Sequence, residues 1–491
     1  MVIRRLIAPH IDFSALRREL KLPSQFSPAA QHEADAIAAS GPVMPATDRT
    51  DIPLVTIDPP TSMDLDQAMC LERRAGGGYR VYYAIADVAV FVTPGGALEA
   101  QTWERGQTVY LPDGKVPLHP TNLSEGAASL LPDQVRPAVL WTIDLDSDGA
   151  TSAVRVERSV VRSRAKLNYP AVAADAAGGR ADEPIALLPE IGKLLVERGL
   201  ERGAINLPIP AQEIEPLGGG GWDLVFAAPL PIEAYNAQIS LLTGVAAAQI
   251  MLAGRVGLLR TMPPPDPRAV AKLQAAAVPL GIAWPAGASV GRVIGAVDGN
   301  DPRGAAFLDQ AAELMRGAGY TAFDGSPPVA PEHGGVAAPY AHVTAPLRRL
   351  ADRYASEVAL ALFAGSRLPE WARAALPKLP DVMTSTDRVA NAAERGAVDL
   401  AEAVLLEGRV GERFDAAVVD VDEPKQPTKS HPGPPTAGAP PRPPRGVIAI
   451  DRPAVRARCE GDGLVLGRRV AVRLIEADPV HRRVMFETVQ T

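Results

Sequence analysis

Short runs of hydrophobic and polar residues with strand-like alternation dominate the first third of the chain. The runs at 52–58, 68–74 and 79–92 are rich in Val, Ile and Tyr, and three glycines at 76–78 separate the last two as a hairpin turn would. Two further runs, 137–145 and 151–161, flank a turn of Asp and Gly residues. The pattern predicts a mostly antiparallel sheet in this part of the chain.

From about residue 165 to 410 the hydrophobic period becomes helical. One segment is apolar and Ala-rich, as in a buried helix, and the others are amphipathic or end at glycine. Helices are predicted at 236–257, 303–319, 345–365 (with Pro346 near its start) and 391–411.

The two ends of the chain differ from this middle part. Residues 1–50 indicate an extended lead-in with one short helix beginning at Ser27-Pro28, because Ser is a favourable N-cap and Pro suits the first helical position. The last part, 404–491, returns to short strand-like runs and predicts a small β-barrel. It is interrupted at 424–445 by nine prolines in 22 residues, a composition that predicts a flexible loop.

Composition excludes several classes of protein. With 50 basic and 57 acidic residues the net charge is −7, so a cationic nucleic-acid coat is excluded, although local basic clusters remain at 155–166 and at 348–353. Either cluster could equally be a solvated face. Cys70 and Cys459 are the only cysteines, which excludes a disulfide framework. No stretch approaches the ~20 apolar residues of a membrane span, so we expect a cytoplasmic protein without membrane contact.

Three carboxylates crowd one constrained turn. An apolar strand delivers Asp58, Pro59-Pro60 prevent its continuation, and Asp64 and Asp66 follow two residues apart. Crowded carboxylates repel unless a cation neutralises them, and oxygen ligands suit Mg²⁺ or Mn²⁺. The alternative is a surface loop of turn-forming aspartates, because such acidic turns are frequent. An EF-hand is excluded, since its Gly and distal Glu are missing.

The segment around these acids resembles the signature of the RNB catalytic domain of RNase II/RNase R-type exoribonucleases. Four further segments resemble motifs of the same family in the same order. The five segments are TIDPPTSMDLDQA (56–68), YYAIADVAVFV (82–92), TVYLPDGKVPLHPTNLSEGAASLLP (108–132), RAKLNYPAV (164–172) and YAHVTAPLRRLADRY (340–354).

The resemblance implies an α+β fold in two parts. Residues 51–403 would form the RNB domain, a mixed, mostly antiparallel sheet surrounded by helices. Residues 404–491 would form the S1 or OB-like barrel. It also implies Mg²⁺-dependent 3′–5′ hydrolysis of single-stranded RNA to nucleoside 5′-monophosphates, with no DNA substrate and Mn²⁺ as a possible substitute metal. The lead-in is too short for the two N-terminal cold-shock domains of longer relatives, so we expect RNA to enter through the RNB domain and the barrel.

Individual residues match the family's functional positions. Asp66, Asp64 and Arg348 match catalytic positions, and Arg348 would stabilise charge on the phosphate from a helix start. Metal ligands would be Asp58, Asp64, Asp66 and Gln67, the last standing where the family usually has a fourth Asp. Contacts to RNA would come from Tyr110, Tyr169, His342 and Arg349.

Several positions depart from the family pattern. Gln67 brings no charge, Ala345 replaces a Ser and Leu350 an aromatic residue. Residues 201–216 carry no aromatic for the terminal-base clamp, and Glu233 lies ahead of the position where paired glutamates usually open a helix. The barrel has only Phe414 and Phe486 as aromatics, which are expected to pack in its core, so we expect its RNA binding to be weak and salt-sensitive.

Three functional hypotheses follow. The first is the exoribonuclease. The second is a catalytically impaired RNB-domain protein that binds RNA or a partner. The third, which ignores the resemblance, is an acidic scaffold whose Pro-rich loop docks an SH3-like partner.

Overall fold

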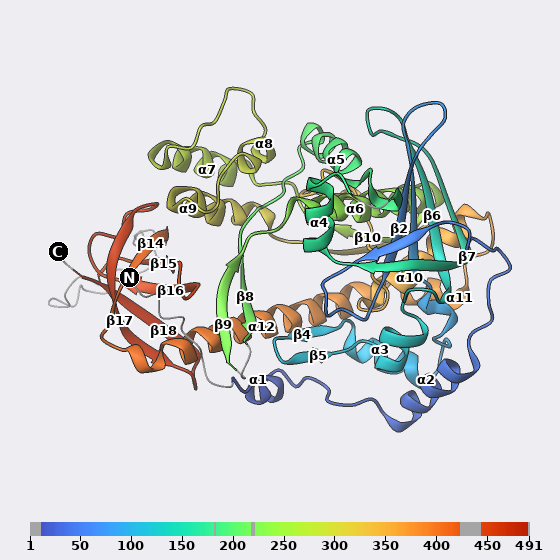
Figure 1. Cartoon of the computed structure of the whole chain (residues 1–491), viewed down its shortest axis with the longest axis horizontal. Helices are drawn as coiled ribbons and strands as arrows, with labels where there is room; N and C mark the ends of the chain where they lie inside the picture. Colours follow the sequence, from blue (N-terminus) through green and yellow to red (C-terminus); the bar gives the residue numbers. More distant parts are fainter. Residues whose placement is uncertain (1–10, 181–182, 218–220, 423–442, 490–491) are drawn as a thin grey trace.

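The computed structural model describes residues 11–180, 183–217, 221–422 and 443–489, and its fold is α+β (Figure 1). Two closed barrels lie at opposite ends of the molecule, and helices fill the space between them. The larger domain contains the first barrel and most of the helices. The C-terminal barrel forms the other end.

The first barrel is built from the strands that hydrophobic alternation predicts. Neighbouring strands run antiparallel, except that the first and last strands pair in parallel and close the barrel, a closure that the sequence pattern did not predict. The turn of the first hairpin needs glycine, because Gly78 has a φ of +76° and a Cβ there would lie 2.2 Å from the Leu145 carbonyl oxygen. In order around the barrel the strands are β1 (Leu54–Ile57), β2 (Gln67–Arg73), β3 (Tyr79–Ala86), β6 (Val135–Leu145) and β7 (Thr151–Leu167).

Four helices organise the rest of the large domain. Among the described residues, only α6 (Pro231–Gly254) is long and apolar enough, by length and composition, to cross a membrane. It packs against α5 (Leu188–Arg202) and α10 (Leu350–Phe363), and its buried residues belong to the main core. The longest helix, α12 (Leu379–Leu406), runs from the large domain to the C-terminal barrel (Figure 1).

The remaining elements of the large domain are short helices and four two-stranded sheets, and these sheets were not predicted. The remaining helices are α1 (Ser14–Glu19), α2 (Pro28–Ser40), α3 (Ala97–Arg105), α4 (Tyr169–Ala177), α7 (Pro267–Leu280), α8 (Val290–Gly295), α9 (Pro302–Ala311) and α11 (Glu370–Ala375). The two-stranded antiparallel sheets are β4 (Val109–Leu111) with β5 (Gly114–Val116), β8 (Ala211–Pro216) with β9 (Trp222–Ala227), β10 (Val256–Thr261) with β11 (Gly319–Asp324), and β12 (Glu332–His333) with β13 (Ala338–Pro339).

The lead-in is folded onto the large domain. The side chain of Ser27 accepts a hydrogen bond from the Ala30 backbone N–H and caps α2 as predicted. An additional helix, α1, precedes it, and Phe13 and Leu16 are buried in one cluster with residues of α12. The described lead-in is therefore part of the large domain's packing.

The C-terminal barrel is closed by five strands, as expected for an S1 or OB-like domain. Phe414 packs edge-on against the fully buried Phe486, with ring centroids 5.6 Å apart, so both aromatics stabilise the barrel core as predicted. Most of the predicted Pro-rich loop, 423–442, lies outside the described residues. In order around the barrel the strands are β14 (Arg413–Val421), β15 (Arg445–Ile450), β16 (Val455–Glu460), β18 (Arg483–Thr488) and β17 (Arg469–Asp478).

Candidate active site

The three aspartates lie on the loop between β1 and β2 and directly beside β2. Ser129 anchors this loop, because its hydroxyl donates to the Met63 carbonyl oxygen at 2.7 Å and accepts from the Leu65 N–H at 3.0 Å. Leu65 is fully buried beneath the loop, and its carbonyl oxygen accepts from the Leu130 N–H. The backbone that carries the acids is therefore held on both sides of Asp64, at Met63 and Leu65.

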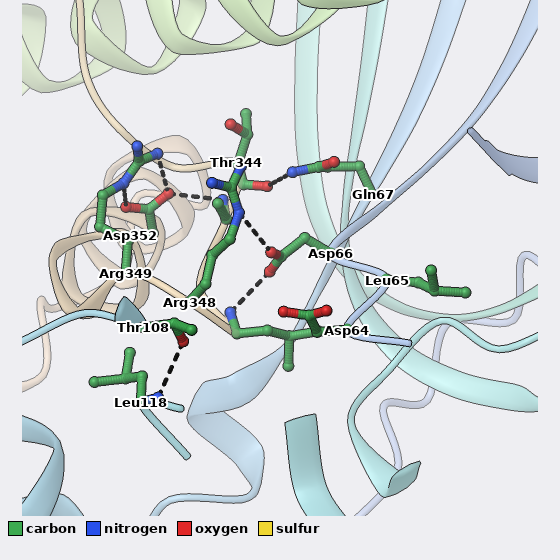
Figure 2. Close-up of polar contacts among 12 residues, drawn as sticks. Asp64, Leu65, Asp66, Gln67, Thr108, Leu118, Thr344, Arg348, Arg349 and Asp352 are labelled. Atoms are coloured by element: carbon green, nitrogen blue, oxygen red, sulfur yellow. Dashed lines mark hydrogen bonds and ion pairs between the residues drawn. The ribbon is translucent and has the colours of Figure 1, made fainter. Parts of the chain in front are cut away.

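Asp66 is the most buried of the three acids, with 2% of its surface exposed. Its Oδ1 accepts the Leu347 backbone N–H at 2.8 Å, and its Oδ2 lies 3.3 Å from Arg348 Nε (Figure 2). Burial raises the pKa of Asp66 to about 8, while the Arg348 charge and the Leu347 N–H oppose this effect. A carboxylate in this position is incompletely compensated, which is the state that a bound cation relieves.

Asp58 lies at the end of β1 and is partly buried. Desolvation raises its pKa to about 6, and the Lys166 charge acts in the opposite direction. Among the described residues, the buried Oδ2 atoms of Asp58 and Asp66 have no hydrogen-bond partner. Carboxylate oxygens without a donor are the ligands that hard cations prefer, so these two residues fit a divalent ion.

In Asp64, unlike Asp58 and Asp66, both carboxylate oxygens have a bonding partner. Its Oδ2 accepts the Tyr110 hydroxyl at 3.0 Å, and its Oδ1 lies 2.9 Å from Lys115 Nζ. Within the part of the chain that is described, no group of three or more His, Cys, Asp or Glu side chains is placed to hold a metal ion. The predicted set of three acids is therefore divided into Asp58 and Asp66, each with one oxygen that lacks a hydrogen bond, and Asp64, whose two oxygens are both bonded.

Gln67 is the first residue of β2, and its amide nitrogen donates to the Thr344 carbonyl oxygen (Figure 2). This bond connects the first barrel to the loop that precedes α10. An amide can donate in this way and a carboxylate cannot, so the departure from the family's Asp has a structural partner here. Metal ligation by Gln67 stays a prediction.

The loop before α10 carries the arginines. Helix α10 begins at Leu350, so Arg348 precedes the helix and the prediction of a helix start near Pro346 was wrong. The loop bends because buried Asp352 accepts the Ala345 N–H at 2.7 Å and both Nε and Nη2 of Arg349, at 2.6 and 2.8 Å. Arg348 is directed to Asp66 instead, with 46% of its side chain exposed. The structure thus gives Arg349 a positioning role and leaves Arg348 available to a ligand.

The predicted RNA-contacting rings have different surroundings. Tyr110 on β4 is 49% exposed and touches Asp64, so its ring lies at the site. Tyr169 begins α4, its hydroxyl accepts from Asn236, and burial raises its pKa to about 12, with the Asp58 charge as a further cause. His342 bonds the Tyr320 hydroxyl at 2.6 Å between two aromatic rings, and burial lowers its pKa well below the usual value. Nδ1 of His342 is therefore already bonded, and contact of this residue with RNA stays a prediction.

Four supporting residues escaped sequence reasoning. Ser129, His119 and Lys115 lie inside a quoted motif, and Asp352 lies three residues after Arg349, a spacing that suits an ion pair. His119 is buried with its Nδ1 3.0 Å from the Leu347 carbonyl oxygen, and burial lowers its pKa to about 4, so it supports the same loop from the other side. The sequence signal that could have identified such residues is a polar side chain within a largely apolar part of a motif.

Two other predicted or visible features lie outside this site. The basic cluster at 155–166 is largely paired internally; Arg158, for example, bonds Asp87 and Glu357. A cavity of about 640 Å³ lies between β9, α9 and the C-terminal barrel, and its lining includes Arg409, Arg452 and Arg456 but none of the three acids. The groups suited to phosphodiester chemistry are therefore the three aspartates and Arg348, and they lie outside this cavity.

Comparisons with known proteins agree with this arrangement. The family described as RNB domain matches residues 46–362, and the RNase II-type exonuclease C-terminal S1 domain matches residues 412–489. The chain is 26% identical to Ribonuclease R of Aquifex aeolicus over 84% of this chain and 60% of that protein. It is 26% identical to Ribonuclease R of Thermotoga maritima over 86% and 62%, respectively. The chain therefore spans about 60% of the length of these relatives.

Solved structures show the same fold at low identity. Mycoplasma genitalium RNase R in complex with ribose methylated single-stranded RNA has a TM-score of 0.81 at 18% identity, covering 97% of this chain and 77% of that one. Yeast Ssd1, a pseudonuclease, has a TM-score of 0.64 at 16% identity, covering 89% and 52%. The RNB match alone spans more than half of the chain. This chain accordingly belongs to the family of proteins with an RNB domain followed by an RNase II-type S1 domain.

Proposed function

We propose that this chain is a Mg²⁺- or Mn²⁺-dependent exoribonuclease that degrades single-stranded RNA from its 3′ end and releases nucleoside 5′-monophosphates. The observation that carries the proposal is the convergence of buried Asp66, the Leu347 N–H and the half-exposed Arg348. Family membership and relatives named Ribonuclease R support it. A cytoplasmic location follows from the sequence alone and stays a prediction.

The residues divide the work by their chemistry. Asp58 and Asp66 would hold a divalent ion, which supplies positive charge to polarise a phosphodiester and lowers the pKa of a bound water. Arg348 binds the charge of the scissile phosphate through guanidinium N–H groups that Asp66 leaves unused. The rings of Tyr110 and Tyr169 offer stacking faces, each worth ~1–3 kcal/mol, which accept any base and so suit digestion without sequence preference.

A catalytically impaired, RNA-binding protein is the second candidate. Its specific support is that both Asp64 oxygens are already partnered, by Tyr110 and Lys115, and that Gln67 brings no charge. RNA binding would then persist through Arg348 and the exposed ring of Tyr110 without turnover.

One assay separates the two. The purified chain is incubated with unpaired RNA labelled at either the 3′ or the 5′ end, in Mg²⁺, Mn²⁺ or chelator. We expect mononucleotides from the 3′ label only with metal, and a loss of at least about 100-fold in rate for Asp66→Asn. Asp148→Asn, in an exposed turn, is the matched control. Binding without any metal-dependent product would favour the impaired protein, and an active Asp66→Asn would contradict the assignment of Asp66.

A further inference from the structure

Lys115 lies inside the acid cluster. It belongs to β5, and its Nζ is 2.9 Å from Asp64 Oδ1 and 3.0 Å from Glu125 Oε1. Only 21% of its side chain and 8% of that of Asp64 are exposed. An ion pair this shielded is screened much less by salt than a surface pair.

The hairpin β4–β5 delivers this cation. Tyr110 and Lys115 are cross-strand partners in it, so both side chains leave the same face and reach the two oxygens of Asp64. The turn is held from α1, because Arg17 bonds both oxygens of Asp113 at 2.8 and 2.6 Å. The hairpin is also joined to the arginine loop, since the Thr108 N–H donates to the Arg348 carbonyl oxygen. The hairpin that carries Lys115 is thus held at its turn by Arg17 and at its start by the arginine loop.

We infer that Lys115 is a resident cation that takes the charge-balancing place of a second divalent ion, so that the site holds a single ion beside Asp58 and Asp66. The inference rests on the metal dependence in the proposed function. Lys115 directly contacts Asp64 and Glu125, Arg348 directly contacts Asp66, and the Lys166 charge acts on Asp58. Both Asp64 oxygens are thus partnered, whereas the Oδ2 atoms of Asp58 and Asp66 lack a hydrogen bond among the described residues and remain for one divalent ion. Gln67, being neutral, adds no charge for another. Lys115 is accordingly a positioning residue that acts through Asp64.

The test counts bound metal without RNA. The full chain is dialysed against Mn²⁺, and bound Mn²⁺ is measured by electron paramagnetic resonance. We expect one ion per wild-type chain and two per Lys115→Met chain, because without the ammonium both Asp64 and Glu125 lose the cation that balances their charge. Lys115→Gln, which keeps a donor to Asp64 and loses only the charge, should also bind two. Lys115→Arg should bind one, as should the matched control Lys193→Met, an exposed position of α5. Circular dichroism confirms that each variant is folded.

The outcomes separate the inference from the function on which it rests. Two ions in the wild-type chain, or one ion in both folded neutral variants, would overturn the inference while leaving metal-dependent hydrolysis intact. No Mn²⁺ bound to the wild-type chain would contradict the metal-dependent function itself, together with the inference. Hydrolysis of unpaired RNA is measured on the same samples. Metal-dependent hydrolysis with the wrong number of ions contradicts only the inference, whereas the absence of metal-dependent hydrolysis contradicts the proposed function.

Discussion

The carboxylate of Asp66 accepts the backbone N–H of Leu347 at 2.8 Å, although 281 positions separate the two residues. This bond brings the loop after β1 against the loop before α10. It also places Arg348, the next residue, 3.3 Å from the other oxygen of Asp66. The acid and the arginine of the site are therefore assembled by a single meeting of two loops, and residues that hold either loop should affect the chemistry.

Ser129 should be required to hold the acid loop. Ser129→Ala removes the donor to the Met63 carbonyl oxygen and the acceptor for the Leu65 N–H, both in buried surroundings. We expect the free energy of unfolding to fall by about 1–3 kcal/mol, because two backbone groups lose their partner. RNA hydrolysis should fall at least about tenfold as Asp64 and Asp66 lose their position. Thermal melting and initial rates measure both effects. Ser147→Ala, in an exposed turn, serves as control.

Neighbouring arginines should respond in opposite ways to the same substitution. Arg349→Lys replaces a fork that bonds both oxygens of buried Asp352 by a single ammonium, so we expect a loss of about 1–3 kcal/mol of stability. Arg348→Lys disturbs one ion pair of a side chain that is 46% exposed, and should change stability by less than about 0.5 kcal/mol.

Their activities complete the comparison. For Arg348→Lys we expect at least a roughly tenfold lower rate at unchanged melting temperature, because an ammonium cannot bind phosphate with two parallel hydrogen bonds. A variant Arg348→Lys that melts early but hydrolyses normally would reverse our assignment of roles to the two residues.

The side-chain N–H of Gln67 should stabilise the fold through its hydrogen bond to the Thr344 carbonyl oxygen. In Gln67→Glu an isosteric carboxylate faces the Thr344 carbonyl oxygen, which then loses its partner. We expect a loss of about 1–3 kcal/mol in stability without metal, since two acceptors meet. Added Mn²⁺ should restore part of this loss, because the new charge lies next to Asp66. Melting with chelator and with Mn²⁺ tests this, and equal destabilisation in both conditions would show that the new carboxylate does not face the metal site.

Glu402 should make the junction between the domains sensitive to pH. This buried residue of α12 accepts hydrogen bonds from Gln212 of β8 and from the Arg456 N–H of β16, both at 2.7 Å. Burial raises its pKa from 4.5 to about 7. Between these values the folded chain binds more protons at this group than the unfolded chain, so its contribution to stability falls as pH rises from 4.5 through 7 and then levels off. The full change is on the order of 3 kcal/mol.

Melting of the wild-type chain and Glu402→Gln at pH 5 and pH 8 measures this contribution. The amide cannot ionise, so Glu402→Gln should gain stability relative to the wild-type chain as pH rises. Glu407→Gln, at an exposed position just after the same helix, should follow the wild-type chain. A constant difference between wild-type chain and Glu402→Gln at both pH values would contradict a raised pKa in the folded state.

The order of elements and the identity of the acids were predictable from the sequence. Strand alternation gave the four long strands of the first barrel, because side-chain burial on a strand repeats every two residues whatever lies opposite. The Ser27 cap of α2 and the S1 or OB-like barrel were likewise encoded over short distances. Ordered motifs identified Asp58, Asp64, Asp66 and Arg348 as the residues of interest.

Only the tertiary structure decided how these residues are partnered. The contacts of Asp66 with Leu347, of Gln67 with Thr344 and of Asp64 with Lys115 join segments that are far apart in the sequence. No local pattern specifies such pairings, because they depend on which loops the closed barrel and its helices bring together. The start of α10 was missed for the same reason, since the backbone at its start pairs with a distant segment: the Leu350 N–H donates to the Gly106 carbonyl oxygen, and the Arg348 carbonyl oxygen accepts the Thr108 N–H. The sequence thus determined which groups are available, and packing determined which of them remain free to act.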